Sequence, residues 1–358
     1  MNKLKALGFL FVFVVPLTLP TAAWLSSVTG QVNLMAWYPL FFLFVLIPAF
    51  DYLLGHDPVN IDKSKERSIS ETFWFKGLTL LVLPVQIGFL IWSAAWFVSQ
   101  PLNPLGTIGW LFSQGIVSSI LAINVAHELI HKDARLEKAF GGILLTSVGY
   151  YGFKIEHLRG HHVHVSTPED ASSARFGQSV WTFMPQALFR NSINAWKLEA
   201  ERLRNAHLPF LHWRNEMLGW TLLWGVFCIG FYAGFGLKGL LFFVLQGLFA
   251  ACSLEVINYI EHYGLERKQL ADGRYERTTH LHSWNSDYAL SNLMLFQLQR
   301  HSDHHAFPKR RYAILRHFED APQLPGGYAA MFVLALFPPL WHHIIDPRVI
   351  AHRQAVQT

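Results

Sequence analysis

Charged residues are scarce in this sequence. Only 15% of its 358 residues are Asp, Glu, Lys or Arg, against about 25% in a typical soluble domain. Hydrophobic residues make up 52% of the chain, and they gather in long uncharged runs. The shortage of charge therefore argues against an ordinary soluble protein and favours a chain that is embedded in a membrane.

Cysteine is almost absent as well. The chain has only Cys228 and Cys252, and both lie in apolar runs. This excludes a disulfide framework and a CxxC metal site, so any iron–sulfur chemistry must come from another chain. The net charge of +5 is modest. We attribute it to cytoplasmic loops that follow the positive-inside rule, and we expect no nucleic-acid partner.

Six apolar runs are each about as long as a bilayer-spanning helix, which takes about 20 residues. We therefore predict an all-α membrane protein that forms a single membrane domain over residues 1–358. The first run resembles a signal peptide, but another apolar run follows within a few residues, so we interpret it as an uncleaved span. The predicted transmembrane helices cover about 6–26, 33–54, 77–99, 106–130, 217–236 and 239–260.

The distribution of positive charge predicts the orientation. The loop 55–76 carries four Lys or Arg residues, whereas the links 27–32 and 100–105 carry none. The positive-inside rule then places the N-terminus in the cytoplasm, and six spans return the C-terminal region to the same side. We expect a multi-pass protein of the cell (inner) membrane.

The polar remainder of the chain should form a cytoplasmic cap, made of residues 131–216 and 261–358. Two shorter apolar segments fall within it, at 139–153 and 328–345. The first is too short to cross, and the second is interrupted by two prolines. We predict that both lie along the interface or pack against the bundle.

Histidine is concentrated in four motifs: HELIHK at the end of the fourth predicted span, EHLRGHH, NYIEHYGL just past the sixth span, and LQRHSDHH. A spacing of four residues places two imidazoles on one helical face. HExxH alone is also the signature of zinc proteases, but a catalytic zinc takes only three protein ligands. The motifs contain nine histidines: His127, His131, His157, His161, His162, His262, His301, His304 and His305.

In the six-span topology all nine can meet just inside the membrane boundary, provided that 139–153 does not cross. Nine neighbouring imidazoles without a metal would lack acceptors for their protons and would repel once charged. We therefore predict two metal ions with four or five ligands each. Imidazole suits zinc, copper, iron or nickel, so the residues alone leave the metal open.

Acidic residues beside these motifs are candidates for orienting the rings from the outside, by accepting the second N–H of a metal-bound histidine. The alternative is that they are ordinary cytoplasmic charge. The four candidates are Glu128, Glu156, Glu261 and Asp303. Eight of the ten histidines outside the motifs are interpreted as solvated or hydrogen-bonded rings, namely His56, His164, His207, His212, His317, His342, His343 and His352.

Together the four motifs resemble the integral-membrane alkane 1-monooxygenases (alkane hydroxylases), in the class that also holds fatty-acid desaturases and xylene monooxygenases. The stretches STPEDASSARFGQS and ADGRYERTTHLHSWNSDYALSNLMLFQLQRHSDHH are similar to that family too. The resemblance covers roughly residues 30–350, and Tyr263 and Gly264 match its third motif. It implies that the nine histidines are the catalytic metal ligands, that they hold two non-haem iron ions, and that O₂ is the co-substrate.

The activity implied by the resemblance is the hydroxylation of n-alkanes to primary alcohols, with the substrate taken from the bilayer through a narrow apolar channel. We expect this channel one or two turns above His127 and His262. The family draws its electrons from rubredoxin, which holds iron on four cysteines. Because this chain has no cysteine after its last motif, we expect the donor to be a separate chain.

Basic residues near the motifs could steer an acidic donor, or could contact lipid headgroups. They are Lys132, Arg135, Arg159, Arg300, Lys309, Arg310, Arg311 and Arg316. Alternative functions are a related di-iron hydroxylase or desaturase acting on fatty acyl or alkyl-aromatic substrates, a membrane zinc protease, and a metal transporter. A transporter would need ionisable residues at mid-membrane, and the predicted spans have almost none.

Overall fold

The computed structural model describes residues 3–357. Regular structure in this part of the chain is helical, with only isolated β-bridges and no strands, which confirms the predicted all-α architecture. Four helices are long and apolar enough to cross a membrane, and a shorter apolar helix follows the first of them. The four are Lys3–Thr29, Phe73–Ser99, Pro104–Ile130 and Glu216–His262, and the shorter helix is Tyr38–Leu54.

The N-terminal half supplies most of the bundle. Its first elements are α1 (Lys3–Gly8), η1 (Phe9–Phe13), α2 (Val14–Thr29), α3 (Val32–Met35), α4 (Tyr38–Phe41), η2 (Phe42–Leu46), α5 (Ile47–Leu54) and α6 (Lys63–Glu71). They are followed by α7 (Phe73–Ser99), α8 (Pro104–Ser118), η3 (Ser119–Asn124), α9 (Val125–Ile130) and α10 (Arg135–Ser147). The start of α8 is typical: Asn103 caps the helix by accepting from the Gly106 N–H, and Pro104 opens its first turn.

The C-terminal half adds the longest helix and several short segments around it. Its elements are α11 (Phe153–Glu156), η4 (His157–His161), α12 (His162–His164), α13 (Val180–Asn205), α14 (Glu216–His262), α15 (Ala289–Met294), α16 (His301–Ala306), η5 (Tyr312–Ile314), α17 (Tyr328–Ala335) and α18 (Pro338–Gln357). The second arm of α14 packs along α8. A Cβ added at Gly115 would lie 2.7 Å from the Phe249 ring, so the two helices need glycine at this crossing.

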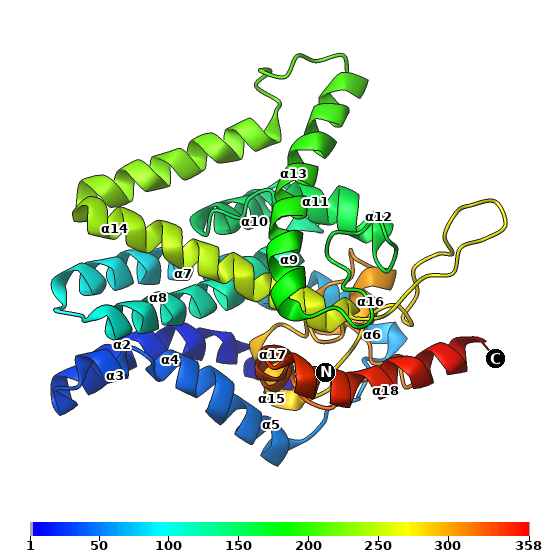
Figure 1. The fold of residues 1–358 in the computed structure, drawn as a ribbon, viewed down its shortest axis with the longest axis horizontal. Helices are drawn as coiled ribbons and strands as arrows, with labels where there is room; N and C mark the ends of the chain where they lie inside the picture. The colour runs from blue at the N-terminus through cyan, green and yellow to red at the C-terminus, as the bar shows by residue number, and fades with distance from the viewer. Residues whose placement is uncertain (1–2, 358) are drawn as a thin grey trace.

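A glycine divides α14 into two arms, which Figure 1 shows meeting at an angle. Gly236 has φ 66° and ψ −164°, a conformation that only glycine adopts without strain. The predicted spans 217–236 and 239–260 correspond to these two arms. A single long hydrophobic run therefore contains a sharp reversal.

Three links between the long helices lie at one end of the bundle, at the left of Figure 1. The Lys238 ammonium, just after the break in α14, donates to the Val98 carbonyl at 3.3 Å and to the Gln100 carbonyl at 3.4 Å. The Asn103 N–H donates to the Asn33 side chain at 2.9 Å. The histidine-bearing segments α9, α12 and α16 lie toward the other end.

The two shorter apolar segments are interrupted helices. Most of 139–153 belongs to α10, which has 13 residues, and the chain turns at Gly149 before α11 begins. In 328–345, α17 stops at Ala335 and α18 starts at Pro338. Neither segment is among the four helices that are long and apolar enough to cross a membrane.

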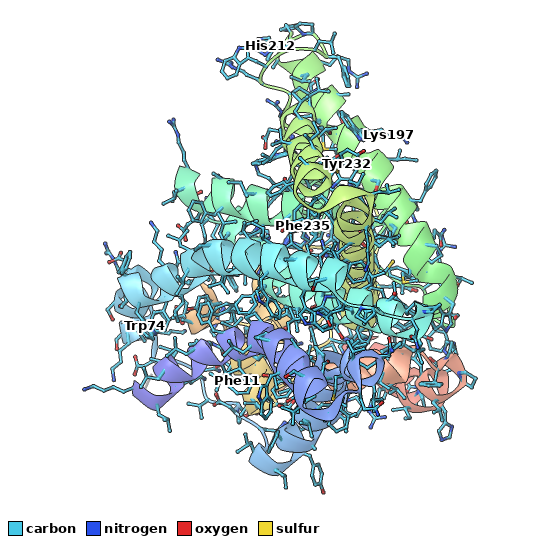
Figure 2. The ribbon with its side chains drawn as sticks, turned by 90° about the vertical axis from the view of Figure 1, so that its left-hand side faces the viewer. Phe11, Trp74, Lys197, His212, Tyr232 and Phe235 are labelled. Carbon is cyan, nitrogen blue, oxygen red and sulfur yellow. The ribbon has the colours of Figure 1, made fainter. Side chains whose placement is uncertain are left out.

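Large apolar side chains cover the outer faces of the helices (Figure 2). On the first arm of α14 the exposed fractions are 72% for Leu222, 63% for Val226 and 70% for Ile229. Such a surface is unusual in water but expected where lipid covers a helix. The loop that carries His212 protrudes beyond this arm at the top of Figure 2.

Candidate metal centre

The nine predicted histidines lie together, where the ends of α9 and α14 meet η4, α12 and α16. They divide into two groups, and within each group the candidate ligand atoms all lie within 4.8 Å of one another. The five-histidine group consists of His127, His131, His157, His162 and His304. The four-histidine group consists of His161, His262, His301 and His305. Motifs far apart in the sequence contribute to both groups.

A π turn in η4 places two of the ligands on one face. The His162 N–H donates to the His157 carbonyl, a step of five residues. In an ordinary α-helix, residues five apart point to different faces, but a π turn stacks them. The Nε2 atoms of His157 and His162 accordingly lie 3.0 Å apart in the five-histidine group, while His161 between them faces the four-histidine group.

The helix α16 divides its histidines in a similar way. His301 and His305 are four residues apart on one face, and their Nε2 atoms are 2.9 Å apart in the four-histidine group. His304 points to the other side, where its Nε2 lies 3.2 Å from that of His162. The HELIHK motif adds His127 and His131 to the five-histidine group, at the end of a helix that contains the π segment η3.

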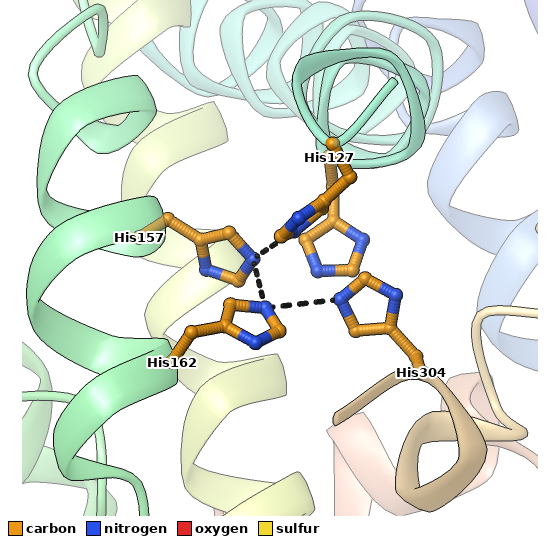
Figure 3. Close-up of side chains that lie close together, drawn as sticks. His127, His157, His162 and His304 are labelled. Atoms are coloured by element: carbon orange, nitrogen blue, oxygen red, sulfur yellow. Dashed lines mark hydrogen bonds between the residues drawn. The ribbon is translucent and has the colours of Figure 1, made fainter. Parts of the chain in front are cut away.

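The ring nitrogens of each group face one another. In Figure 3 the rings of His127, His157, His162 and His304 surround a common point. The Nε2 atoms of His131 and His157 are 3.0 Å apart, and the buried Nε2 of His127 has no hydrogen-bond partner. Two such nitrogens cannot satisfy each other when both carry lone pairs, whereas a metal ion accepts every one of them. The residues therefore fit a metal in each group.

The electrostatics of the site also suit a metal. Burial, together with the neighbouring imidazoles, holds the pKa of His131, His157 and His304 well below its usual range. These rings are therefore neutral at physiological pH, which leaves the lone pair free for coordination.

A carboxylate that the sequence analysis missed supports one ring from outside. The Nδ1 atom of His161, which points away from the four-histidine group, lies 2.9 Å from the Asp170 carboxylate. Burial acts to raise the pKa of Asp170, but His161 and the Ser173 hydroxyl outweigh it and hold the pKa at about 2. Such an anionic acceptor fixes the orientation of a metal-bound imidazole. Asp170 stands in an irregular loop, where no periodic pattern marks it.

The four acids proposed from sequence occupy different environments. Glu128 forms an ion pair with Lys132 at 3.0 Å, and Asp303 accepts from Arg316 at 2.9 Å. Glu156 has a buried carboxylate oxygen without a partner. Only Glu261 contacts a ring of the two groups, that of His301. Because Glu128 is already engaged by a lysine, it is poorly placed to act as the base of a zinc protease.

Three of the basic residues near the motifs are internal, which corrects the expectation that they steer a partner. Lys132 donates to the Arg310 carbonyl at 2.8 Å, Arg300 to the Leu315 carbonyl at 2.6 Å, and Arg311 to Glu137 at 2.9 Å. All three are buried. Sequence proximity to the motifs could not separate these structural cations from exposed ones.

An apolar cavity reaches the metal centre from the bundle. At one end His127, Glu261 and His301 line it, and on α8 it extends as far as Ile116. Eleven helical residues separate His127 from Ile116, or about 16 Å at 1.5 Å per residue. The cavity lies above His127 and His262, where the channel was expected. Its remaining lining is Leu43, Phe44, Ser119, Ile120, Asn124, Phe153, Ser253, Leu254, Ile257, Asn258, Met294, Leu295, Leu298, Tyr328, Ala329 and Phe332.

Comparison with known proteins gives consistent matches. A model of the fatty acid desaturase family matches residues 102–335. Alkane 1-monooxygenase 2 of Pseudomonas aeruginosa is 49% identical over 355 residues, covering 98% of this chain and 94% of that protein. Alkane 1-monooxygenase 1 of the same organism is 50% identical over 354 residues, covering 98% and 93%. The xylene/toluene monooxygenase hydroxylase component of Pseudomonas putida is 28% identical over 277 residues, covering 76% and 73%.

Proposed function

The chain belongs to the alkane 1-monooxygenase family, and from this we propose that it hydroxylates the terminal carbon of n-alkanes at a non-haem di-iron centre. The reaction consumes O₂, two electrons and two protons, and yields a primary alcohol and water. The observation that carries the proposal is the junction of the two histidine groups with the apolar cavity. A saturated chain has no polar group to bind, so an apolar cavity is the site that suits it.

We propose one iron in each group, held by the five and the four histidines respectively. A terminal C–H bond has no acidic proton and no polarity, so general acid–base catalysis by side chains cannot break it. Bound iron would supply the O₂-derived oxidant that this step requires. The chain's own contribution is to hold the rings neutral and oriented, and to present the substrate end-on.

We propose that the cavity holds a linear chain with one end at the metals. Tyr328 of α17 bonds to Glu261 beside His301, and Phe332 lies one turn later on the same helix, about 6 Å along its axis. There the Phe332 ring stacks on Phe44 of η2, with ring centroids 4.9 Å apart. This aromatic pair forms part of the cavity wall, so it would restrict the room for a bound chain, and selectivity for the terminal methyl would follow from shape.

Replacing Phe332 by Ala is expected to shift the preferred substrate toward longer alkanes, because the cavity gains the volume of the ring. The measurement is the alcohol profile from a mixture of alkanes between octane and hexadecane. Phe337, which is 55% exposed, provides a matched control, and Phe337→Ala should leave the profile unchanged. An unchanged profile for Phe332→Ala would show that this pair does not limit the substrate.

We propose that the six predicted segments all cross the cell (inner) membrane, with the N-terminus and the metal centre in the cytoplasm. The three clustered links support this, since two carry no Lys or Arg and the third carries only Lys238. The two arms of α14 would account for the fifth and sixth crossings. Alkane dissolved in the bilayer would then enter the cavity from the side.

We further propose rubredoxin, as a separate chain, for the electron donor. His162 is the one ligand candidate that is only partly buried, and its neighbour Val163 is 54% exposed. Phe307, two residues after His305, is 44% exposed and has the guanidinium of Arg316 4.9 Å from its ring. Exposed apolar side chains next in sequence to the metal-site histidines, one of them with a guanidinium beside it, would suit contact with a small acidic donor.

The function is tested with purified enzyme in detergent or nanodiscs, supplied with octane, O₂ and reduced rubredoxin. We expect 1-octanol as the product, and no product when rubredoxin is omitted. Desaturated acyl chains or aromatic alcohols formed in place of 1-octanol would favour a related di-iron enzyme with a different substrate. Stoichiometric zinc in active material would contradict the iron assignment.

A further inference from the structure

Glu261 approaches the four-histidine group from the side on which a metal would sit. Its Oε2 lies 3.2 Å from the Nε2 atom of His301. That same nitrogen is 2.9 Å from the Nε2 of His305 and 3.2 Å from the Nε2 of His262. The carboxylate oxygen therefore borders the four-histidine group on its His301 side, next to the ring nitrogens that converge there.

Glu261 and Asp170 contact opposite sides of their histidine rings. Asp170 bonds the Nδ1 atom of His161, the nitrogen that points away from the group. Glu261 contacts the inward Nε2 of His301, while the outward Nδ1 of His301 is buried without any partner. A carboxylate that only oriented His301 would be bonded to that Nδ1 atom. Glu261 is therefore on the inward side of the His301 ring, within reach of a metal held by that group.

The surroundings of Glu261 leave its charge uncompensated. Its side chain is 2% exposed, and within residues 3–357 it has no Lys or Arg at ion-pair distance. One oxygen is held by the Tyr328 hydroxyl at 2.8 Å, which leaves the other free to point at the group. A buried carboxylate without a cation is costly unless it takes up a proton or coordinates a metal, and the adjacent ring nitrogens of the four-histidine group favour the metal.

We propose that Glu261 is a tenth metal ligand, coordinating the ion of the four-histidine group through Oε2. Both ions then have five donors, and one of them has an anionic oxygen among neutral nitrogens. Glu261 lines the apolar cavity together with His301 and with His127 of the five-histidine group, so this oxygen donor would lie on the side of the centre that meets the substrate. The inference rests on the proposed dimetal centre and assigns the anionic donor to one of its two ions.

The test uses enzyme loaded with ⁵⁷Fe and examined by Mössbauer spectroscopy, together with iron content and the rate of iron loss to a chelator. In the intact protein we expect two iron signals of equal area. Glu261→Gln, which keeps the shape and removes the charge, should alter one signal only and speed the loss of one iron at least tenfold. Glu261→Asp retains the charge and should lose iron more slowly than Glu261→Gln.

Glu255→Gln is the matched control, since Glu255 is a buried carboxylate on the same helix that bonds Asn258 and Tyr150 and no histidine. It should leave both iron signals as they are. Thermal unfolding of each variant separates loss of the fold from loss of a ligand.

If Glu261→Gln leaves both Mössbauer signals and the rate of iron loss unaltered, the assignment of Glu261 as a metal ligand is wrong, while the di-iron proposal stands. Intact enzyme that is active without iron would overturn both proposals.

Discussion

Replacing His304 by Ala is expected to abolish alcohol formation and to reduce the iron content from two ions to about one per chain. The Nε2 atom of His304 lies 3.2 Å from that of His162, and its ring centroid is 4.2 Å from that of His127. It is the one member of the five-histidine group that comes from α16. Without it the group loses the donor that joins α16 to the HELIHK and EHLRGHH motifs, and metal affinity falls with donor number. Iron analysis and the octane assay measure the two effects.

The control is His343→Ala, which removes an exposed histidine outside both groups. It should retain two irons and full activity. His304→Ala also separates the present proposal from a zinc protease built on HELIH alone, because in such an enzyme the later motifs would be dispensable. Full activity of His304→Ala would therefore contradict the di-iron assignment.

Replacing Asp170 by Asn is expected to lower the affinity of the four-histidine group for its metal by about 10- to 100-fold, the usual cost of losing such a partner. The amide is uncharged and no longer stabilises the Nδ1–H of His161 as strongly. We expect the five-histidine group to keep its iron. Iron retention during dialysis against a graded chelator measures the difference, with activity restored by added ferrous iron.

A second Asp–His pair gives the control for Asp170→Asn. Asp320 lies 2.8 Å from the Nε2 of His280, a closely similar geometry at an exposed position outside the metal centre. Asp320→Asn should leave iron binding unchanged. Equal iron retention in the two variants would mean that the carboxylate behind His161 does not support the metal.

Much of the helical architecture could be predicted from the distribution of apolar residues. Runs of about 20 uncharged residues can satisfy their backbone groups in a membrane only as helices, and the six predicted runs fall on helical segments. The break at Gly236 was within two residues of the predicted boundary, because a lone lysine and several glycines interrupt the run there. Whether every segment crosses the bilayer depends on the surrounding lipid.

The meeting of the nine histidines was expected from the predicted topology, in which two of the motifs end long helices, at α9 and α14, and the structure places the other two in short helices beside those ends. Their division into two groups could not be predicted. It depends on the π turn between His157 and His162. A backbone hydrogen bond that spans five residues in place of four has no recognisable sequence pattern. The role of Asp170 was hidden for a related reason, since a loop has no period that reveals which way a side chain points.

Charge near the motifs was the least informative signal. Lys132, Arg300 and Arg311 looked like surface cations in the sequence, yet each is buried and bonded to backbone carbonyls or acids. A guanidinium can satisfy several buried acceptors at once, so a cationic residue in a cap is as suited to cross-linking loops as to meeting a partner. Only the fold distinguishes the two uses.

The π turn of η4 has a consequence for how the enzyme is assembled. In the proposed centre His157 and His162 would hold one ion and His161 the other, so a six-residue stretch of backbone would bridge both. Filling either position would fix the pitch of this stretch and lower the entropic cost of filling the second. The first metal should accordingly ease the uptake of the second during maturation.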